Sequence, residues 1–215
     1  MNKIGKKDKA LAAVEALKLL YPDALCSLDY NDPFQLLVAT RLSAQCTDAR
    51  VNLVTPELFG KYPTAEAMAA ADVADVEKII HACGFFRQKA KDIVATAGVI
   101  VSQYGGNVPD TIEVLTTLPG VGRKTANLIV GDVYGKPAVV ADTHLIRISN
   151  RLGLVHTKDP YKVELQLKEL LPPEESNNYC HRNVLHGRAV CDARKPRCEG
   201  CSLNGFCTYY ELTKG

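Results

Sequence analysis

The last 25 residues of the chain contain four cysteines in a Cys-x6-Cys-x2-Cys-x5-Cys array: Cys191, Cys198, Cys201 and Cys207. Thiolates separated by such short loops can close around one tetrahedral metal ion or one [4Fe-4S] cluster. Disulfides are disfavoured, because the N-terminus alternates charged and apolar residues and lacks the continuous apolar segment of a signal peptide. Zinc sites usually contain two Cys-x2-Cys pairs, and only Cys198 and Cys201 form such a pair here. The spacing therefore favours an iron-sulfur centre and leaves zinc as the alternative.

Basic side chains concentrate between residues 180 and 197, although the net charge of the whole chain is only +2. This segment carries a single acid, Asp192, against five basic residues: Arg182, Arg188, Arg194, Lys195 and Arg197. The last three lie between the first two cysteines of the array, where a bound centre would hold them on an exposed loop. Such a loop suits phosphate, and an ordinary solvated basic face is the alternative.

Helical signals run along almost the whole chain, and no paired runs of alternating β-branched residues occur. An apolar residue recurs every three positions from Leu11 to Leu20. Capping residues predict helix starts at Asp32 with Pro33, Thr64, Asp72, Asp110 with Glu113, and Asp159 with Pro160. Helix ends are predicted at Gly84, at the glycines that follow Tyr104, and at Pro172. The predicted fold class is all-α.

The order of these segments predicts two helical domains. Residues 26–136 form a central multi-helix domain, and the N-terminal helix packs against the C-terminal half, which gives a discontinuous domain of residues 1–25 and 137–215. The thiols outside the array, Cys26, Cys46, Cys83 and Cys180, are expected to be small buried core residues. The chain has no uncharged apolar run of about 18 residues, so no membrane partner is expected and the predicted location is the cytoplasm.

The segment LPGVGRKTANLIVG, residues 118–131, is the second strong signal. One helix is predicted to end at Thr117 and the next to begin near Arg123. Between them, Gly120 and Gly122 allow positive φ and a close approach of backbone amides to another molecule. Those amides, beside the positive end of a helix, form an anion site suited to a DNA phosphate. A helix corner with glycines for packing alone is the alternative.

LPGVGRKTAN, followed by VVADTHLIRISNRLGL and the four-cysteine array, resembles the endonuclease III family of the helix-hairpin-helix DNA glycosylases. The resemblance extends from SAQCTD at residues 43–48 to Cys207. It implies two helical lobes, one [4Fe-4S] cluster on the four cysteines, and double-stranded damaged DNA as the partner of a prokaryotic, nucleoid-associated monomer. The implied activities are DNA N-glycosylase and DNA-(apurinic or apyrimidinic site) lyase in base excision repair. Arg123 and the two hairpin glycines would contact DNA.

Cleavage of an N-glycosidic bond develops positive charge on the sugar, which a carboxylate stabilises while a nucleophile traps C1′. By resemblance, Asp142 and Lys124 fill these roles, and a lysine nucleophile implies strand cleavage by β-elimination. Burial near the lobe interface and the adjacent helix end would lower the pKa of Lys124, whereas a neighbouring carboxylate would raise it. The alternatives are a phosphate-contacting lysine and an aspartate that only caps the helix THLIRISNRL.

Three further residues are assigned to DNA contact by the same resemblance. Gln45 would fill the hole left by an extruded base, and Phe85 would be the apolar wedge in the opposite strand, with Phe86 as an alternative wedge. His144 would reach a phosphate. The alternatives are a surface glutamine and a core phenylalanine.

Two observations favour oxidised pyrimidines, of the thymine-glycol type, as the substrate. Adenine-mispair glycosylases have a glutamate upstream of the SAQCTD-like segment, whereas LLVATRLSAQ contains no carboxylate. Mismatch-specific thymine glycosylases tend to have tyrosine where this chain has Lys124. A non-catalytic helix-hairpin-helix DNA-binding module and a zinc-stabilised structural protein are the alternatives from other functional classes.

Overall fold

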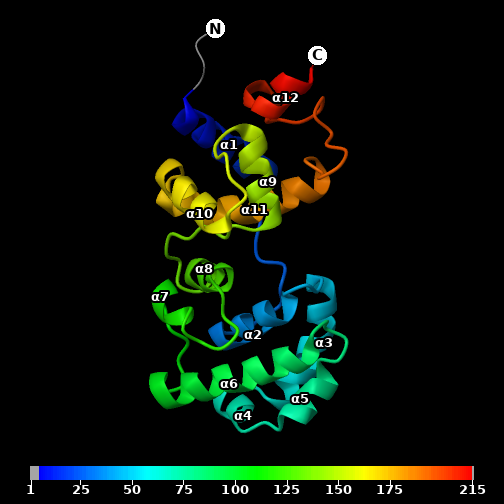
Figure 1. The fold of residues 1–215 in the computed structure, drawn as a ribbon, viewed down its shortest axis with the longest axis vertical. Helices are drawn as coiled ribbons and strands as arrows, with labels where there is room; N and C mark the ends of the chain where they lie inside the picture. The colour runs from blue at the N-terminus through cyan, green and yellow to red at the C-terminus, as the bar shows by residue number, and fades with distance from the viewer. Residues whose placement is uncertain (1–4, 215) are drawn as a thin grey trace. The chain divides into compact units, whose positions relative to one another are not determined.

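In the computed structural model, residues 5–214 are described, and they contain helices and no strand (Figure 1). The all-α prediction is therefore confirmed for this range. Residues 1–4 and 215, which the predicted discontinuous domain included, lie outside the described residues. Within the described range, no helix has the length and apolar character needed to cross a membrane. The chain divides into two compact units, each described by itself below.

The first compact unit is Cys26–Tyr134. Helix α2 lies at its centre, since eight of the eleven residues of this helix are buried, and it packs against α3, α6 and α8. The long helix α6 packs in turn against α4 and α5. The helices of this unit are α2 (Pro33–Ser43), α3 (Asp48–Lys61), α4 (Ala65–Ala69), α5 (Val73–Ile79), α6 (Phe86–Tyr104), α7 (Ile112–Leu115) and α8 (Arg123–Asp132).

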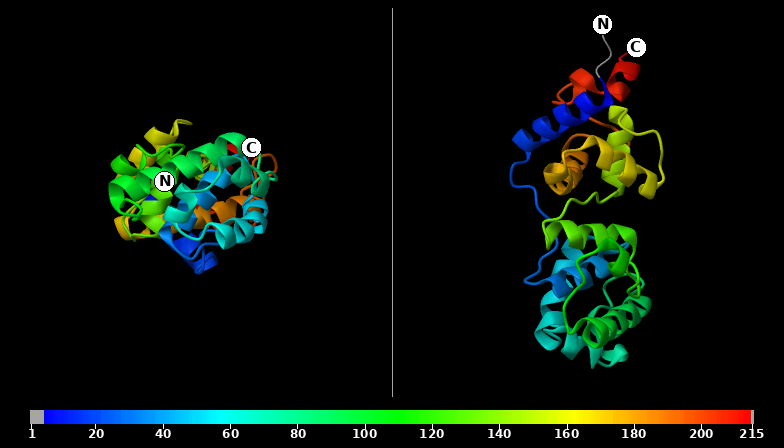
Figure 2. Two further views of the ribbon diagram at one scale, coloured as in Figure 1. Left: turned by 90° about the horizontal axis from the view of Figure 1, so that it is seen from below. Right: turned by 90° about the vertical axis from the view of Figure 1, so that its left-hand side faces the viewer.

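The other compact unit joins the segment that ends at Leu25 to the segment that begins at Gly135. Figure 2 shows the blue N-terminal helix among the yellow to red helices of the C-terminal segment. Helix α1 packs against α10 and α11, and α9 packs against α11 and α12. The elements of this unit are α1 (Lys6–Leu20), α9 (Thr143–Leu152), α10 (Pro160–Leu170), η1 (Pro173–Glu175), α11 (Ser176–Ala189), η2 (Asn204–Phe206) and α12 (Thr208–Thr213).

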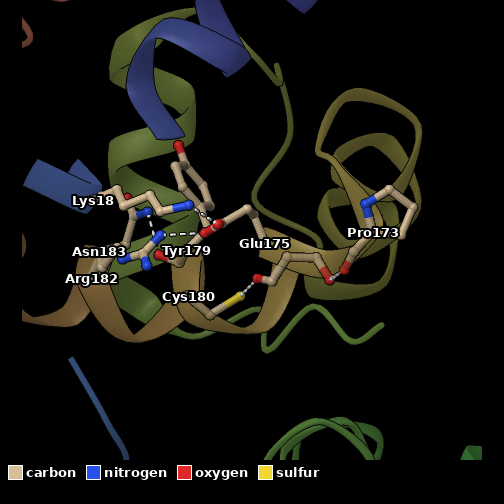
Figure 3. A network of polar contacts seen from close by, with 8 residues as sticks. Lys18, Pro173, Glu175, Tyr179, Cys180, Arg182 and Asn183 are labelled. Atoms are coloured by element: carbon tan, nitrogen blue, oxygen red, sulfur yellow. Dashed lines mark hydrogen bonds and ion pairs between the residues drawn. The ribbon is translucent and has the colours of Figure 1, made fainter. Parts of the chain in front are cut away.

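An ionic network joins α1 to α11 in this unit (Figure 3). Lys18 Nζ donates to Glu175 Oε1, and Arg182 Nη1 donates to Glu175 Oε2 at 2.5 Å. Arg182 is only 4% exposed. Its guanidinium therefore binds the protein's own carboxylate and is not available to an external phosphate.

Most predicted helix starts are confirmed by side-chain caps. The Asp32 carboxylate accepts from Gln35 N, and α2 begins with Pro33. Thr64, Asp72 and Asp159 cap α4, α5 and α10 in the same way. The predicted helix ends after Tyr104, where Gly105 adopts a left-handed conformation, and before Pro172 are confirmed as well.

Four local predictions were wrong. Helix α7 starts at Ile112, so Thr111 holds the cap position and accepts from Val114 N, one residue after the predicted Asp110. The same helix ends at Leu115, before the predicted Thr117. Helix α5 ends at Ile79, because the chain then turns toward α6, and Gly84 lies in that turn. Of the four thiols expected in the core, only two are buried, whereas Cys26 and Cys46 are half-buried.

Candidate active site and metal centre

The hairpin between α7 and α8 is held in place by close packing at Gly120. Its φ is +70°, in the left-handed region that favours glycine. A Cβ atom at this position would lie 2.6 Å from Asp92 Oδ2 and 2.7 Å from Arg41 Nε. Those two side chains form an ion pair, with Arg41 Nε donating to Asp92 Oδ2 at 2.9 Å. Gly120 therefore serves the packing of the turn.

Gly122 serves a different purpose. Its φ is −90°, so the positive φ that the sequence allowed at both glycines occurs only at the first. Gly122 is exposed, and a Cβ atom there would meet nothing within 4 Å. It is the N-cap of α8, and as a glycine it has no side chain that could accept a hydrogen bond from the first amides of that helix. This open helix N-terminus, at Arg123, suits an anion.

Lys124 is the second residue of α8, and its side chain is exposed. Within residues 5–214 its ammonium makes no hydrogen bond or ion pair. The ammonium is available to an external partner, at the positive end of a helix that carries no acidic residue in its first turn.

Asp142 caps α9, as the sequence predicts: its Oδ1 accepts from Leu145 N at 2.7 Å. The side chain is half-buried, and within residues 5–214 no donor reaches its Oδ2. The cap thus fixes the rotamer of Asp142 and leaves one carboxylate oxygen for another molecule. His144 is oriented two residues later, since its Nδ1 lies 3.1 Å from Arg147 Nη2.

Gln45 and Phe85 share an unusual backbone conformation. Among the described residues they are the two non-glycine residues with positive φ, at 53° and 57°. Both side chains are exposed, and both line one cavity together with Arg41, Ala44, Gln88 and Lys89. Left-handed conformations of such residues are strained and cluster at functional sites. The fold of the unit therefore holds this glutamine and this phenylalanine at one exposed place.

The two candidate wedge residues differ in exposure. Phe85 is 69% exposed. Phe86 is half-buried and packs against the His81 ring, with ring centroids 4.5 Å apart. Phe85 is therefore the aromatic ring that can enter a partner without unpacking the protein.

The four cysteines of the C-terminal array surround a single cavity, whose lining is otherwise mostly apolar. No disulfide joins them. Among residues 5–214, no three His, Cys, Asp or Glu side chains converge closely enough to hold one metal ion. Four cysteines around one space are a ligand set for either a [4Fe-4S] cluster or one zinc ion.

Two arginines of α9 hold the start of the array. Arg151 donates to Cys191 Sγ at 3.1 Å and to the Asp192 carbonyl at 2.6 Å, and it stacks on the Tyr209 ring at 4.8 Å. Arg147 donates to the Cys191 carbonyl at 3.0 Å. The first cysteine is thus attached to the helix that Asp142 caps.

The predicted basic loop is exposed and ordered. It carries Arg194, Lys195 and Arg197, all exposed. Asp192 Oδ1 accepts from the amides of Arg194 and Lys195 at 2.8 and 3.0 Å. These backbone hydrogen bonds hold the pKa of the Asp192 carboxyl below its ordinary value. The loop therefore presents its cations from a fixed turn.

Comparisons with known proteins agree with this arrangement. Residues 38–173 match the HhH-GPD superfamily of base excision DNA repair proteins, and residues 191–207 match the iron-sulfur binding domain of endonuclease III. The chain is 51% identical to the endonuclease III of Synechocystis sp. over 204 residues, which cover 94% of this chain and 93% of that protein. This chain belongs to the endonuclease III family.

Two solved structures are similar to the chain over almost its whole length. One is a non-covalent endonuclease III–DNA complex, with a TM-score of 0.90 and 38% identity, covering 97% of this chain and 98% of that one. The other is a trapped endonuclease III–DNA covalent intermediate, with a TM-score of 0.91 and 38% identity, covering 97% and 99%.

Membership of the endonuclease III family makes the chain a base excision repair enzyme, a DNA glycosylase with AP lyase activity. It carries one [4Fe-4S] cluster, as predicted. The match to the iron-sulfur domain of endonuclease III begins at Cys191 and ends at Cys207, the first and last cysteines of the array. The zinc alternative is thereby excluded.

Two residues of this site were missed by the sequence reasoning. Lys89 is fully buried beneath the cavity of Gln45 and Phe85, and its Nζ donates to the Leu42 carbonyl at 2.7 Å. The available signal was its place on the apolar face of α6, four residues before the buried Ile93. The role of Arg151 at the array had no comparable signal, since it depends on a contact 40 residues away.

Proposed function

We propose that the protein removes oxidised pyrimidines from double-stranded DNA and then cleaves the strand through a covalent bond to Lys124. The observation that carries this proposal is the state of Lys124, an exposed lysine without a protein partner in residues 5–214, at an open helix N-terminus. The similarity to a trapped endonuclease III–DNA covalent intermediate supports a nucleophilic residue. An amine is the nucleophile that also explains lyase chemistry.

In the proposed reaction, neutral Lys124 Nζ forms a bond to C1′ of the deoxyribose as the bond from C1′ to the damaged base breaks. Opening of the sugar gives a Schiff base, which acidifies the proton at C2′. Loss of that proton expels the phosphate on the 3′ side and breaks the strand. Water finally hydrolyses the Schiff base and regenerates the amine.

Asp142 would serve this reaction with the carboxylate oxygen that no donor reaches within residues 5–214. A fixed carboxylate stabilises the positive charge that develops on the sugar. It can also accept the proton that the Lys124 ammonium must lose before attack. The cap to Leu145 N keeps the carboxylate rotamer unchanged between these steps.

Access to a base in a duplex requires its extrusion from the stack. Gln45 and Phe85 would occupy the opened step, the glutamine in the hole left by the base and the aromatic ring between bases of the opposite strand. Their exposure and shared cavity support this assignment. The open N-terminus of α8 after Gly122, and His144 near the N-terminus of α9, would bind phosphates of the backbone.

The [4Fe-4S] cluster would be held by the four thiolates of the array. Its contribution is structural, since it ties the basic loop of residues 192–197 to the rest of the unit. Arg151 and Asp192 already order residues 192–195 of that loop, and the exposed cations Arg194, Lys195 and Arg197 would contact DNA phosphates. We further infer that a monomer acts on chromosomal DNA at the bacterial nucleoid.

The second candidate substrate is a mispaired base. The chain has Lys124 and lacks a carboxylate in residues 36–45, and both features favour oxidised pyrimidine over an adenine mispair. A panel of duplexes, each with one damaged or mispaired base, separates the candidates. Release of free base and strand cleavage should both be fastest with thymine glycol, and faster release from a mispair would contradict the proposal.

Replacement of Lys124 tests the covalent step. Lys124→Gln keeps a flexible polar side chain, although a shorter one, and removes the nucleophile, so thymine-glycol duplex should still bind while base release and nicking are lost. The control is Lys78→Gln, which removes the charge of another exposed lysine, in the last turn of α5. Nicking by the Lys124→Gln protein at the normal rate would remove this lysine from the mechanism.

A further inference from the structure

Two cysteines outside the metal centre lie close to Gln45 and Phe85 along the chain. Cys46 follows the glutamine, and Cys83 precedes the phenylalanine by two residues. The two thiols lie close enough to interact electrostatically. The two backbones also approach each other closely, since a Cβ atom at Gly84 would lie 3.7 Å from the Gln45 carbonyl oxygen. The chain thus brings two thiols together, 37 positions apart in the sequence, at the base of both exposed side chains.

The two thiols differ in access and share a cation. Cys83 is fully buried, and this burial together with the neighbouring Cys46 raises its pKa to about 11. Cys46 is half-buried, so it is the thiol that a small reagent can reach. The buried ammonium of Lys89 acts electrostatically on both sulfurs. Thiol–disulfide exchange proceeds through the thiolate, and beside Cys83 the Lys89 ammonium opposes part of the rise in pKa that burial causes.

We propose that Cys46 and Cys83 are a redox-modification site, which a low-molecular-weight disulfide such as glutathione disulfide converts into an intramolecular disulfide. The Cys46 thiolate first attacks the small disulfide, which gives a mixed disulfide and releases one small thiol. The Cys83 thiolate then attacks the Cys46 sulfur and expels the second small thiol. The protein loses two electrons and two protons, and one small disulfide is reduced to two thiols.

The effect of this bond on activity rests on the proposed function. Gln45 and Phe85 are both held in left-handed backbone conformations, and in the reduced protein no covalent bond joins the two segments. A covalent bond at residues 46 and 83 fixes the spacing of the two side chains. Because both must enter one opened base-pair step, the oxidised protein loses base release. A dithiol reductant restores it.

Tryptic peptides provide a direct test of the pairing in the holoenzyme. Cleavage after Arg41, Arg50, Lys78 and Arg87 gives the peptides 42–50 and 79–87, each with a single cysteine. Treatment with glutathione disulfide should yield these peptides as one cross-linked species, which dithiothreitol separates. Cys46→Ala and Cys83→Ala should abolish the species, and the control Cys26→Ala should retain it. Absence of the cross-linked species from the oxidised wild type overturns the proposal.

Base release from a thymine-glycol duplex is measured on the same samples, and visible absorption reports the state of the cluster. The wild type should lose base release on oxidation and recover it with dithiothreitol, whereas Cys46→Ala should stay active throughout. A cross-linked protein with normal base release overturns the regulatory role, as does an equal loss in Cys46→Ala. Inactivity of the fully reduced wild type would instead refute the proposed function, and the peptide result would stand independently.

Discussion

Gly120→Ala should destabilise the unit Cys26–Tyr134, because the new methyl group meets two obstacles. Alanine at φ +70° is strained by about 1–2 kcal/mol. Its Cβ would also lie 2.6 Å from Asp92 Oδ2 and 2.7 Å from Arg41 Nε, so the ion pair must shift. Overpacking of this kind costs about 1–3 kcal/mol, which gives a total loss of about 2–5 kcal/mol in the free energy of unfolding.

Thermal unfolding followed by circular dichroism measures this loss. For a chain of this size the melting temperature should fall by about 4–20 °C. The hairpin that begins α8 should loosen at the same time, so DNA binding should weaken at temperatures where the unit is still folded.

Gly122→Ala is the matched control, two residues away in the same hairpin. Its φ is −90° and its Cβ would meet nothing within 4 Å, so the loss of stability should stay below about 1 kcal/mol. Its DNA binding should nevertheless weaken, because a methyl group at the open end of α8 keeps phosphate away from the amides. We assign Gly120 to the packing of the turn and Gly122 to the close approach of phosphate. Equal free energies of unfolding of the two variants would refute this assignment.

Two other substitutions test the C-terminal unit. Glu175→Gln should cost about 1–2 kcal/mol at neutral pH, because the nearly buried Arg182 loses its ionic partner. Hydrogen bonds from Lys18 and from the Arg182 guanidinium lower the pKa of the Glu175 carboxyl from its ordinary value of 4.5. The carboxylate therefore stabilises the fold above pH 4.5, and this stabilisation is lost as the pH falls through the lowered pKa. Urea unfolding across this pH range should show that the free energies of unfolding of the wild type and of Glu175→Gln become equal in acid. A difference that stays constant with pH would contradict the ionic explanation. Arg194→Ala should weaken DNA binding and reduce the slope of log binding constant against log salt concentration by about 1. The cleavage product should stay the same, and a changed product would contradict a role in phosphate contact alone.

Local signals in the sequence were sufficient for most of the helices. A cap such as Asp32 before Pro33 depends only on neighbouring residues, so the pattern predicted the start of α2. The end of α5 at Ile79 could not be read in this way, because the turn that follows is set by the packing of α5 against α6. Gly84 has the residue type of a helix stop and serves instead in that turn.

The candidate site was predictable where a role requires a particular residue type, as in the cysteine array that holds the cluster. Exposure and backbone strain were not predictable, because they follow from the fold. Neither Gln45 nor Phe85 is a glycine, so nothing in the sequence indicated their left-handed conformations. Lys89 carries a charge that is typical of surface residues, yet it is fully buried. This position is explained by the hydrogen bond that it donates to a backbone carbonyl at the C-terminal end of α2, a contact that follows from the fold.

Borohydride trapping on a thymine-glycol duplex tests the covalent role of Lys124 most directly. Reduction of the Schiff base should leave a stable protein–DNA adduct, and tryptic mapping should find the sugar remnant on the peptide 124–147, uncleaved after its first lysine and at the Lys136–Pro137 bond. An active enzyme that yields no adduct, or an adduct on another amine of the chain, would contradict the mechanism.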